Sequence, residues 1–255
     1  MSPLPPPDTA GVRRFAPRPV ALEKLPELAR DTAALLGAAP LRLCGLFLLV
    51  FMAVQLMPSI PYLSMPLRSV IATVGFSGFF IALEAVRQGQ PPTILDMAQA
   101  WRLPPDKLVL LVASGLVPLF LVLLVWWSDI GGQAVAAVLA GNPAPGVPGE
   151  RQQLEFIVIY NLVDIPLLFL QPLCVLFPWT ASRTLSANLL AVLANWRWAL
   201  LLGLISIPVA ILLESFDPNS TVEVLLALGG EVLVEILLCA FTLVLLHRSL
   251  RPSLE

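Results

Sequence analysis

Six long apolar stretches constrain this chain of 255 residues more than any other feature. Each is close to the roughly 20 residues that a helix needs to cross the hydrocarbon core of a bilayer. They cover residues 41–57, 67–86, 108–127, 154–177, 198–213 and 222–246. Hydrophobic residues make up 58% of the chain and charged residues only 13%, so a soluble fold would leave much apolar surface in water. The sequence therefore predicts an all-α, polytopic membrane protein with six transmembrane helices in residues 38–250.

The lysines and arginines predict how these helices are oriented, because cytoplasmic loops of membrane proteins carry an excess of basic residues. Both terminal regions and the alternate loops hold Arg13, Arg14, Arg18, Lys24, Arg30, Arg42, Arg87, Arg102, Lys107, Arg183, Arg197, Arg248 and Arg251. The opposite loops hold only Arg68 and Arg151. This distribution places both termini in the cytoplasm, and its alternation supports the count of six spans.

Several segments outside the spans have patterns of their own. Residues 1–20 hold six prolines and three arginines, which predicts an extended cytoplasmic tail. Residues 21–37 carry leucines at near-helical spacing among charged residues, which favours an amphipathic helix at the membrane surface. A helix packed on cytoplasmic loops is the alternative. Similar stretches at 94–101 and 185–196 precede the third and fifth spans. The chain would then repeat one unit three times, in which an interfacial helix is followed by two spans joined by an outer loop. The outer loop 128–151 predicts a short surface helix followed by a turn-rich segment.

Ionisable side chains inside the spans are the first place to look for function, because each costs about 2.5–3.5 kcal/mol on insertion scales. Asp164 lies in the fourth span, and Glu231 and Glu235 lie four residues apart on one face of the sixth. We therefore expect the three carboxylates to meet near the midplane. Asn161 and Gln171 fall within a narrow arc of the fourth helix together with the aspartate, at 100° per residue. The cluster predicts either a proton- or cation-binding site or hydrogen-bonded groups that hold the helices together.

Other residues are assigned to the membrane surface or to helix packing. Arg68 is expected to reach the outer headgroups, and otherwise to pair with Glu231 or Asp164. Tryptophan favours the headgroup region, so five interface anchors are predicted at Trp126, Trp127, Trp179, Trp196 and Trp198. Kinks are predicted at the prolines inside spans, which are Pro118, Pro166, Pro172 and Pro208. Close helix contacts are predicted at the small-residue pairs Gly78/Ala82 and Ala199/Gly203.

The sequence contains no motif of catalysis, metal binding or cofactor binding. His247 is its only histidine, which excludes a multi-histidine metal site. Cys44, Cys174 and Cys239 lie in apolar stretches without a CxxC pair, so we expect buried thiols and no disulfide framework. A net charge of −2 argues against nucleic acid as a partner. We therefore expect a non-enzymatic protein without metal or cofactor.

Four segments have a recognisable order along the chain. The first three are APLRLCGLFLLV, MPSIPYLSMPLRSV and EAVRQGQPPTILDMAQAWR, and a later one is LFPWTASRTLSANLLAVLANWRWALLLGLI. Over residues 38–250 this order resembles a family of uncharacterised proteobacterial inner-membrane proteins known mainly by a locus tag. That family is distantly similar to the membrane domain found beside some glycerophosphodiester phosphodiesterases. The resemblance implies a six-span bundle in the bacterial inner membrane, and it implies neither an activity nor site residues.

Three hypotheses of function follow. The leading one is a scaffold or accessory subunit of a membrane complex, in which the tail and the interfacial helices dock a partner protein. The alternative is a small-solute or ion transporter that uses the midplane carboxylates. A further alternative is lipid handling, because interfacial helices and a kinked bundle can admit acyl chains. In all three, the lipid bilayer surrounds the chain.

Overall fold

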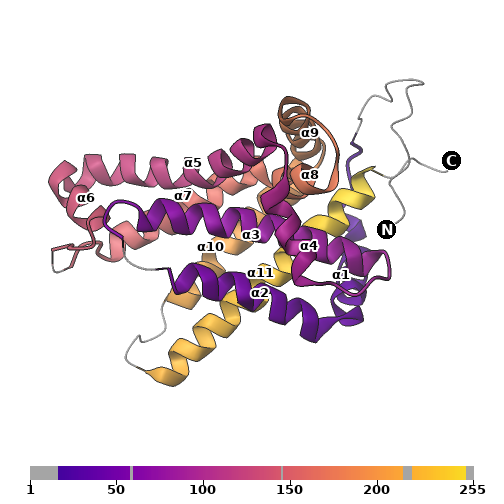
Figure 1. Ribbon diagram of the computed structural model, residues 1–255, viewed down its shortest axis with the longest axis horizontal. Coiled ribbons are helices and arrows are strands. Elements are labelled where there is room, and N and C mark those ends of the chain that lie inside the picture. Colours follow the sequence, from indigo (N-terminus) through magenta and orange to yellow (C-terminus); the bar gives the residue numbers. More distant parts are fainter. Residues whose placement is uncertain (1–16, 58–59, 145, 215–219, 251–255) are drawn as a thin grey trace.

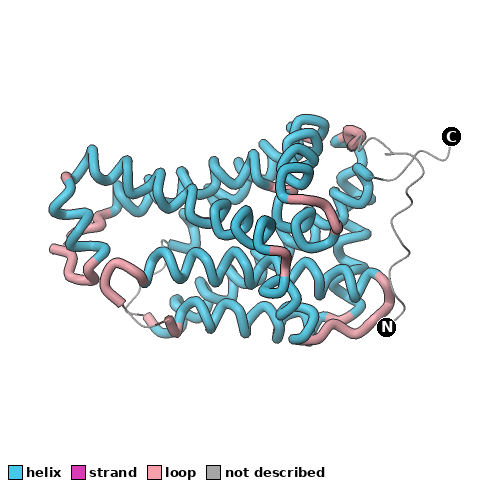
Figure 2. The backbone as a smooth tube through the Cα atoms, turned by 45° about the horizontal axis from the view of Figure 1, so that its top comes forward, coloured by secondary structure: helices cyan, strands magenta, loops and turns pink. Residues whose placement is uncertain are grey.

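The computed structural model describes residues 17–57, 60–144, 146–214 and 220–250, and the regular elements within these ranges are all helices (Figure 2). In chain order they are η1 (Leu22–Lys24), α1 (Leu25–Ala38), α2 (Pro40–Gln55), α3 (Ser64–Arg87), α4 (Ile94–Ala98), η2 (Gln99–Arg102), α5 (Pro105–Ile130), α6 (Gly132–Leu139), α7 (Glu150–Leu167), α8 (Leu170–Leu176), α9 (Ala181–Ala194), α10 (Trp196–Glu214) and α11 (Thr221–Leu250). The prediction of an all-α protein is confirmed for this part of the chain. Most of the predicted tail lies outside the described residues.

Four helices, α3, α5, α10 and α11, are long and apolar enough to cross a membrane. Two further candidates are bent pairs. The segment of η1 and α1 meets α2 at 86°, and α7 meets α8 at 47°. Each of the six predicted spans coincides with one of these helices or pairs. The protein is therefore a helical protein with four to six candidate spans, as expected of a polytopic membrane protein.

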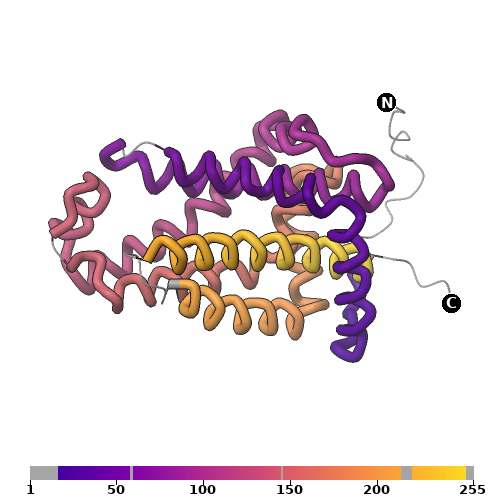
Figure 3. Tube along the Cα trace, turned by 90° about the horizontal axis from the view of Figure 1, so that it is seen from below, coloured from indigo at the N-terminus to yellow at the C-terminus, as the bar shows by residue number. Residues whose placement is uncertain are grey.

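The long helices run roughly along the longest axis of the molecule, and the short helices gather at its two ends (Figures 1 and 3). One end carries α1, α4 and α9, and the described chain also begins and ends there. The opposite end carries α6, the short helix predicted in the outer loop. The element order has the predicted alternation, since α1, α4 and α9 precede α2, α5 and α10, respectively.

The central helix is α3, which packs against α2, α4, α5, α8 and α11. Aromatic side chains fill its contact with α2. The Phe47 ring stacks on Phe76 at a centroid distance of 5.0 Å and meets Phe79 edge to face at 5.2 Å. Leu83 on α3 and Leu243 on α11 are fully buried in the same cluster. These contacts join the first, second and sixth predicted spans into one core.

Two of the predicted small residues allow helices to approach closely. A Cβ atom at Gly78 would lie 2.3 Å from the carbonyl oxygen of Met97, so α3 meets the backbone of α4 there. A Cβ atom at Gly203 would lie 2.5 Å from Cγ1 of Ile165, where α10 meets α7. The alanine of each pair is buried as well. The predicted helix contacts at these pairs are confirmed.

The prolines inside the spans differ in their effect. Helices α5 and α10 continue through Pro118 and Pro208. In the fourth span, Pro166 directly precedes the break between α7 and α8, and Pro172 lies within α8. The predicted kink in the fourth span is therefore found after Pro166.

Candidate functional site

The three predicted carboxylates lie on two helices that both pack against α10. Asp164 is on α7, and Glu231 and Glu235 are on α11. The half-buried Glu235 interacts electrostatically with both of the others, which places the three groups in one neighbourhood. The side chains of Asp164 and Glu231 are exposed on the protein surface. They are thus accessible to whatever surrounds the helices, whether lipid, water or another chain.

The predicted polar stripe on the fourth span is interrupted. Asn161 shares α7 with Asp164, and its amide donates to the carbonyl of Ile157 in its own helix at 2.8 Å. Gln171 lies in α8, beyond the 47° bend. The prediction of one stripe counted 100° per residue along a single helix, whereas the bend separates Gln171 from the helix that carries Asn161 and Asp164. A shared face for the three side chains stays a prediction. The remaining polar pair on α7 is Asn161 and Asp164.

Arg68 near the start of α3 has a local partner. Its guanidinium donates to the carbonyl of Met57 at 3.2 Å, at the end of the segment that follows α2. The ion pairs of the described residues do not include this arginine. Arg68 therefore holds the connection between α2 and α3, and the proposed pairing with Asp164 or Glu231 is not found.

A polar seam that the sequence interpretation missed crosses the middle of the bundle. Ser69 on α3 donates to the carbonyl of Gly115 on α5 at 2.5 Å, and its hydroxyl lies 3.5 Å from that of Tyr160 on α7. The glycine is required here, because a Cβ atom would lie 2.2 Å from Oγ1 of Thr73. Ser69, Thr73 and Ser77 recur every four residues on one face of α3. That spacing was the available signal for a helix contact.

The break between α7 and α8 is bridged by a side chain from α9. Asn188 donates to the carbonyl of Pro166 at 2.7 Å and accepts from the N–H of Phe169 at 3.1 Å. Asn188 is fully buried, so water does not reach this break. The Asn188 amide therefore supplies the hydrogen-bond partners of the Pro166 carbonyl and the Phe169 N–H. The buried face of α9 carries Thr184 and Asn188, and the buried Asn195 follows directly as its C-cap residue. These polar residues in an otherwise apolar stretch were the signal for a packed helix.

The end of α8 is held by a buried cation. Lys107, near the start of α5, donates to the carbonyl of Cys174 at 2.7 Å and to that of Phe177. The last carbonyls of a helix lack partners within it and carry partial negative charge. The residue before Lys107, Asp106, accepts a hydrogen bond from the N–H of Ala181 at the start of α9, at 2.9 Å. Lys107 thus has a structural role that counting basic residues did not reveal.

Two of the predicted tryptophan anchors are enclosed by the protein. Trp126 packs beneath α6, and Trp198 lies under the N-terminal segment, where its indole donates to the carbonyl of Val20 at 2.8 Å. These two rings contact the fold rather than headgroups, because elements from elsewhere in the chain cover them. The position of a tryptophan at the end of a predicted span did not show whether its ring faces headgroups or is covered by the protein.

The other three tryptophans are more accessible. Trp127 and Trp196 are exposed, and Trp179 is partly buried. The guanidinium of Arg183 lies 5.2 Å from the Trp179 ring, and that of Arg197 lies 5.6 Å from the Trp196 ring. Their role as headgroup anchors stays a prediction.

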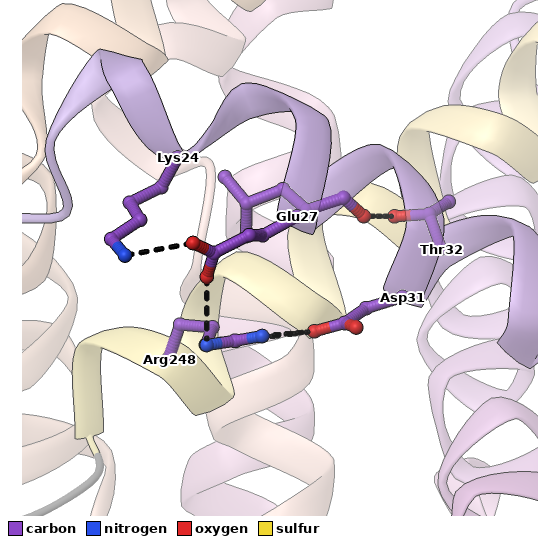
Figure 4. A network of polar contacts seen from close by, with 6 residues as sticks. Lys24, Glu27, Asp31, Thr32 and Arg248 are labelled. Carbon is purple, nitrogen blue, oxygen red and sulfur yellow. Dashed lines mark hydrogen bonds and ion pairs between the residues drawn. The ribbon is translucent and has the colours of Figure 1, made fainter.

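Figure 4 shows the ion pairs that join α1 to α11. Arg248 donates to Asp31 at 2.5 and 3.2 Å, and its guanidinium lies 3.5 Å from Glu27. Lys24 donates to Glu27 at 2.7 Å, and this hydrogen bond holds the pKa of Glu27 below its usual range. We call these four residues the α1–α11 latch. It fixes α1 across the end of the bundle.

A second group joins α11 to α3 at the same end. The ring Nε2 of His247 lies 2.9 Å from a carboxylate oxygen of Glu84. The same carboxylate accepts from Arg87 at 2.6 and 2.7 Å and from Gln88 at 2.8 Å. The acidic groups Asp31, Glu27 and Glu84 are therefore all engaged within the fold.

The N-terminal segment is tied to this end by hydrogen bonds. The N–H of Arg18 donates to the carbonyl of Ser249 at 3.0 Å, and the Ser249 hydroxyl donates to the carbonyl of Arg18 at 3.0 Å. The buried Asn195 accepts from the N–H of Val20 at 2.9 Å and donates to the Ser249 hydroxyl at 3.0 Å. Residues 17–20 have no regular secondary structure, and these hydrogen bonds hold them against α11 and Asn195.

Within the described residues, no group of three or more histidine, cysteine, aspartate or glutamate side chains is arranged to hold a metal ion. Comparison with known protein families, with curated proteins and with solved structures gave no match. The fold is that of an all-α protein with four to six candidate spans, which is compatible with a multi-pass membrane protein. The resemblance to the proteobacterial family stays a prediction.

Proposed function

We propose that this protein is a non-enzymatic, multi-pass protein of the bacterial inner membrane that acts as a scaffold or accessory subunit of a membrane complex. Both termini would lie in the cytoplasm. A partner would dock on the end of the bundle that carries α1, α4 and α9, which we call the short-helix end. The observation that supports this proposal most is the gathering of these three helices at the end of the bundle where the described chain begins (Figures 1 and 3).

Apolar side chains on this end favour a contact with something other than water. Leu95 on α4 and Leu193 on α9 are 70% and 69% exposed, and Leu25 on α1 is exposed as well. Large exposed apolar side chains outside the predicted spans are expected on surfaces that bind proteins or membranes. The hydrogen-bonded segment 17–20 lies at the same end, so one partner would contact both the segment and these leucines.

Photo-crosslinking in intact membranes tests the proposal. A photoreactive amino acid at Leu193 is expected to give a discrete adduct with one protein. The same replacement at Leu124, which is 66% exposed on α5, serves as the matched control and should give no adduct. If Leu25, Leu95 and Leu193 all give lipid adducts alone, and the gently purified protein is a lone monomer, the scaffold proposal is refuted.

A transporter of protons or cations is the second candidate, favoured by the neighbourhood of Asp164, Glu231 and Glu235. Proteoliposomes loaded with a pH-sensitive dye measure proton entry under an imposed membrane potential. Transport predicts that Asp164→Asn or Glu235→Gln abolishes entry while Glu150→Gln, an exposed residue at the start of α7, leaves it unchanged. Equal proton entry for wild type and for a variant with alanine at all three positions would eliminate this candidate.

A further inference from the structure

A cavity of about 450 Å³ lies at the corner between α1 and α2. It is formed where the chain turns by 86° at Ala39 and where the loop 89–92 follows α3. Small-molecule sites in proteins have volumes of about 300–1,000 Å³, so this corner cavity has room for a ligand of modest size.

Arg42 supplies the charge of the corner cavity. It is the only charged side chain among the described residues that line the cavity, and the guanidinium has no hydrogen bond or ion pair within those residues. The carboxylates of Glu84 on α3 and Asp31 on α1 do not line the cavity and are paired with Arg87, His247 and Arg248. The cavity therefore presents one uncompensated positive charge.

The polar groups beside Arg42 fit an oxyanion. Gln90 lines the cavity and provides an amide donor. The α2 helix begins here at Pro40, and its N-cap residue Ala39 has no side chain to accept from the first-turn N–H groups. These N–H groups and the guanidinium point to the same chemistry, since both favour phosphate oxygens.

The surroundings of the cavity are apolar. Leu41 lines it and is 88% exposed, and Val86, Pro91 and Pro92 lie on the loop side. Leu41 also begins the first predicted span, so the cavity is placed where headgroups and acyl chains meet. A ligand with both a phosphate and a hydrocarbon part matches these two environments.

We propose that the corner cavity binds the headgroup of an anionic phospholipid of the phosphatidylglycerol type. Arg42 would bind the phosphodiester, and Gln90 would donate to phosphate or glycerol oxygens. No carboxylate among the described lining residues is available to receive the amine of a zwitterionic headgroup. The site therefore favours lipids with net negative charge. This inference requires only that the chain lies in a bilayer, so it is independent of the scaffold and transporter proposals.

The test uses full-length protein in detergent, stripped of lipid and titrated with dioctanoyl-phosphatidylglycerol, with dioctanoyl-phosphatidylcholine and with glycerol 1-phosphate. Native mass spectrometry counts the bound molecules. Wild type should bind one phosphatidylglycerol more tightly than either of the other two. Arg42→Gln should weaken that binding at least about tenfold, the effect of losing a charge-assisted hydrogen bond. Arg30→Gln, which removes the same charge from an exposed position on α1, should bind as wild type does.

Each other result overturns the inference. Equal losses in the Arg42 and Arg30 variants would mean a diffuse attraction to the basic end of the bundle. Equal affinity for phosphatidylcholine would refute the selectivity, and equal affinity for glycerol 1-phosphate would indicate a site for soluble phosphates. Thermal unfolding checks that Arg42→Gln is folded. Gln90→Leu gives a second probe, for which unchanged phosphatidylglycerol binding would contradict the proposed role of the amide.

Discussion

The side-chain amide of Asn188 donates to the backbone carbonyl of Pro166 at 2.7 Å, and this contact joins α9 to the last turn of α7. The same amide accepts from the N–H of Phe169 on the other side of the break. A helix interrupted inside a bundle leaves backbone groups without partners, and each costs free energy if it is buried unpaired. Asn188 removes this cost, so α9 is part of the support of the fourth span.

The first prediction follows from this contact. Asn188→Leu keeps a similar volume but leaves the carbonyl of Pro166 and the N–H of Phe169 without a partner. We expect a loss of roughly 2–4 kcal/mol in the free energy of unfolding, because each buried unpaired group costs about 1–3 kcal/mol. Unfolding in detergent mixtures measures it. Ser186→Ala on the exposed face of α9 is the control, with an expected effect within about 0.5 kcal/mol. Equal stability of the two variants would contradict the bridging role.

Much of the helical layout could be predicted from the sequence, because the free energy of moving a residue into lipid depends mainly on that residue and can be summed along the chain. The predicted spans 67–86 and 108–127 correspond to α3 (Ser64–Arg87) and α5 (Pro105–Ile130). Proline at position 166 also indicated the place of the bend, since it removes a backbone donor. Properties of single residues and short windows were sufficient for these features.

The site was less predictable because it depends on pairs of residues far apart in the chain. The stripe that included Gln171 assumed one straight helix, whereas the chain bends by 47° between α7 and α8. Lys107 and Asn188 bond to backbone groups 67 and 22 residues away, which hydropathy does not encode. Trp198 has the sequence context of a headgroup anchor, but residues 17–20 cover it. In each case, tertiary contact decided the environment.

The second prediction concerns the close approach of α3 to α4. In Gly78→Ala the new Cβ atom would lie 2.3 Å from the carbonyl oxygen of Met97, and a backbone oxygen cannot rotate away. We expect a loss of about 1–3 kcal/mol, the usual range for overpacking. Gly45→Ala on α2 is the matched control, because no atom lies within 4 Å of its Cβ position. That change should be neutral or stabilise by up to about 1 kcal/mol. A destabilisation shared equally by both variants would argue against the contact.

The third prediction concerns the α1–α11 latch. Asp31→Asn removes the main partner of Arg248, whose side chain is 30% exposed against 36% for Asp31. Partly exposed ion pairs contribute up to about 1 kcal/mol, so we expect α1 to detach locally while the bundle stays folded. Amide hydrogen exchange should become faster in α1 and remain unchanged in α3. Lys24→Gln is the control, because it removes an ion pair within the η1–α1 segment and keeps the pair between Asp31 and Arg248. Its α1 exchange should be closer to wild type than that of the Asp31 variant. Slower or equal exchange in the Asp31 variant would contradict the latch.

The latch should also respond to acid. The pKa of Glu27 is lowered chiefly by the hydrogen bond from Lys24 and also by the charge of Arg248 on α11, so protonation of Glu27 weakens its attraction to α11. A carboxyl whose pKa is lower in the folded state stabilises that state above its unfolded pKa, and the contribution is lost as the pH falls through the folded value. The exchange rate of α1, corrected for intrinsic chemistry, should therefore be constant above about pH 5 and rise below the usual carboxyl range, which centres near pH 4.3. A rise between neutral pH and pH 6 would point to a group other than Glu27.

The fourth prediction tests whether the fourth span, the bent pair α7 and α8, crosses the membrane, through two positions on either side of that pair. Gln133→Cys on α6 and Ser182→Cys on α9 are both exposed, and they are introduced after Cys44, Cys174 and Cys239 are replaced by alanine. If α7 and α8 together cross the membrane, a membrane-impermeant maleimide labels the first variant in intact spheroplasts. It labels the second only after permeabilisation. If the pair enters and leaves on one side, both variants react under the same condition. That result would give an odd number of crossings and separate the two termini, contrary to the side-by-side contacts of Arg18 and Ser249. The contact between these two residues therefore favours opposite labelling of the two positions.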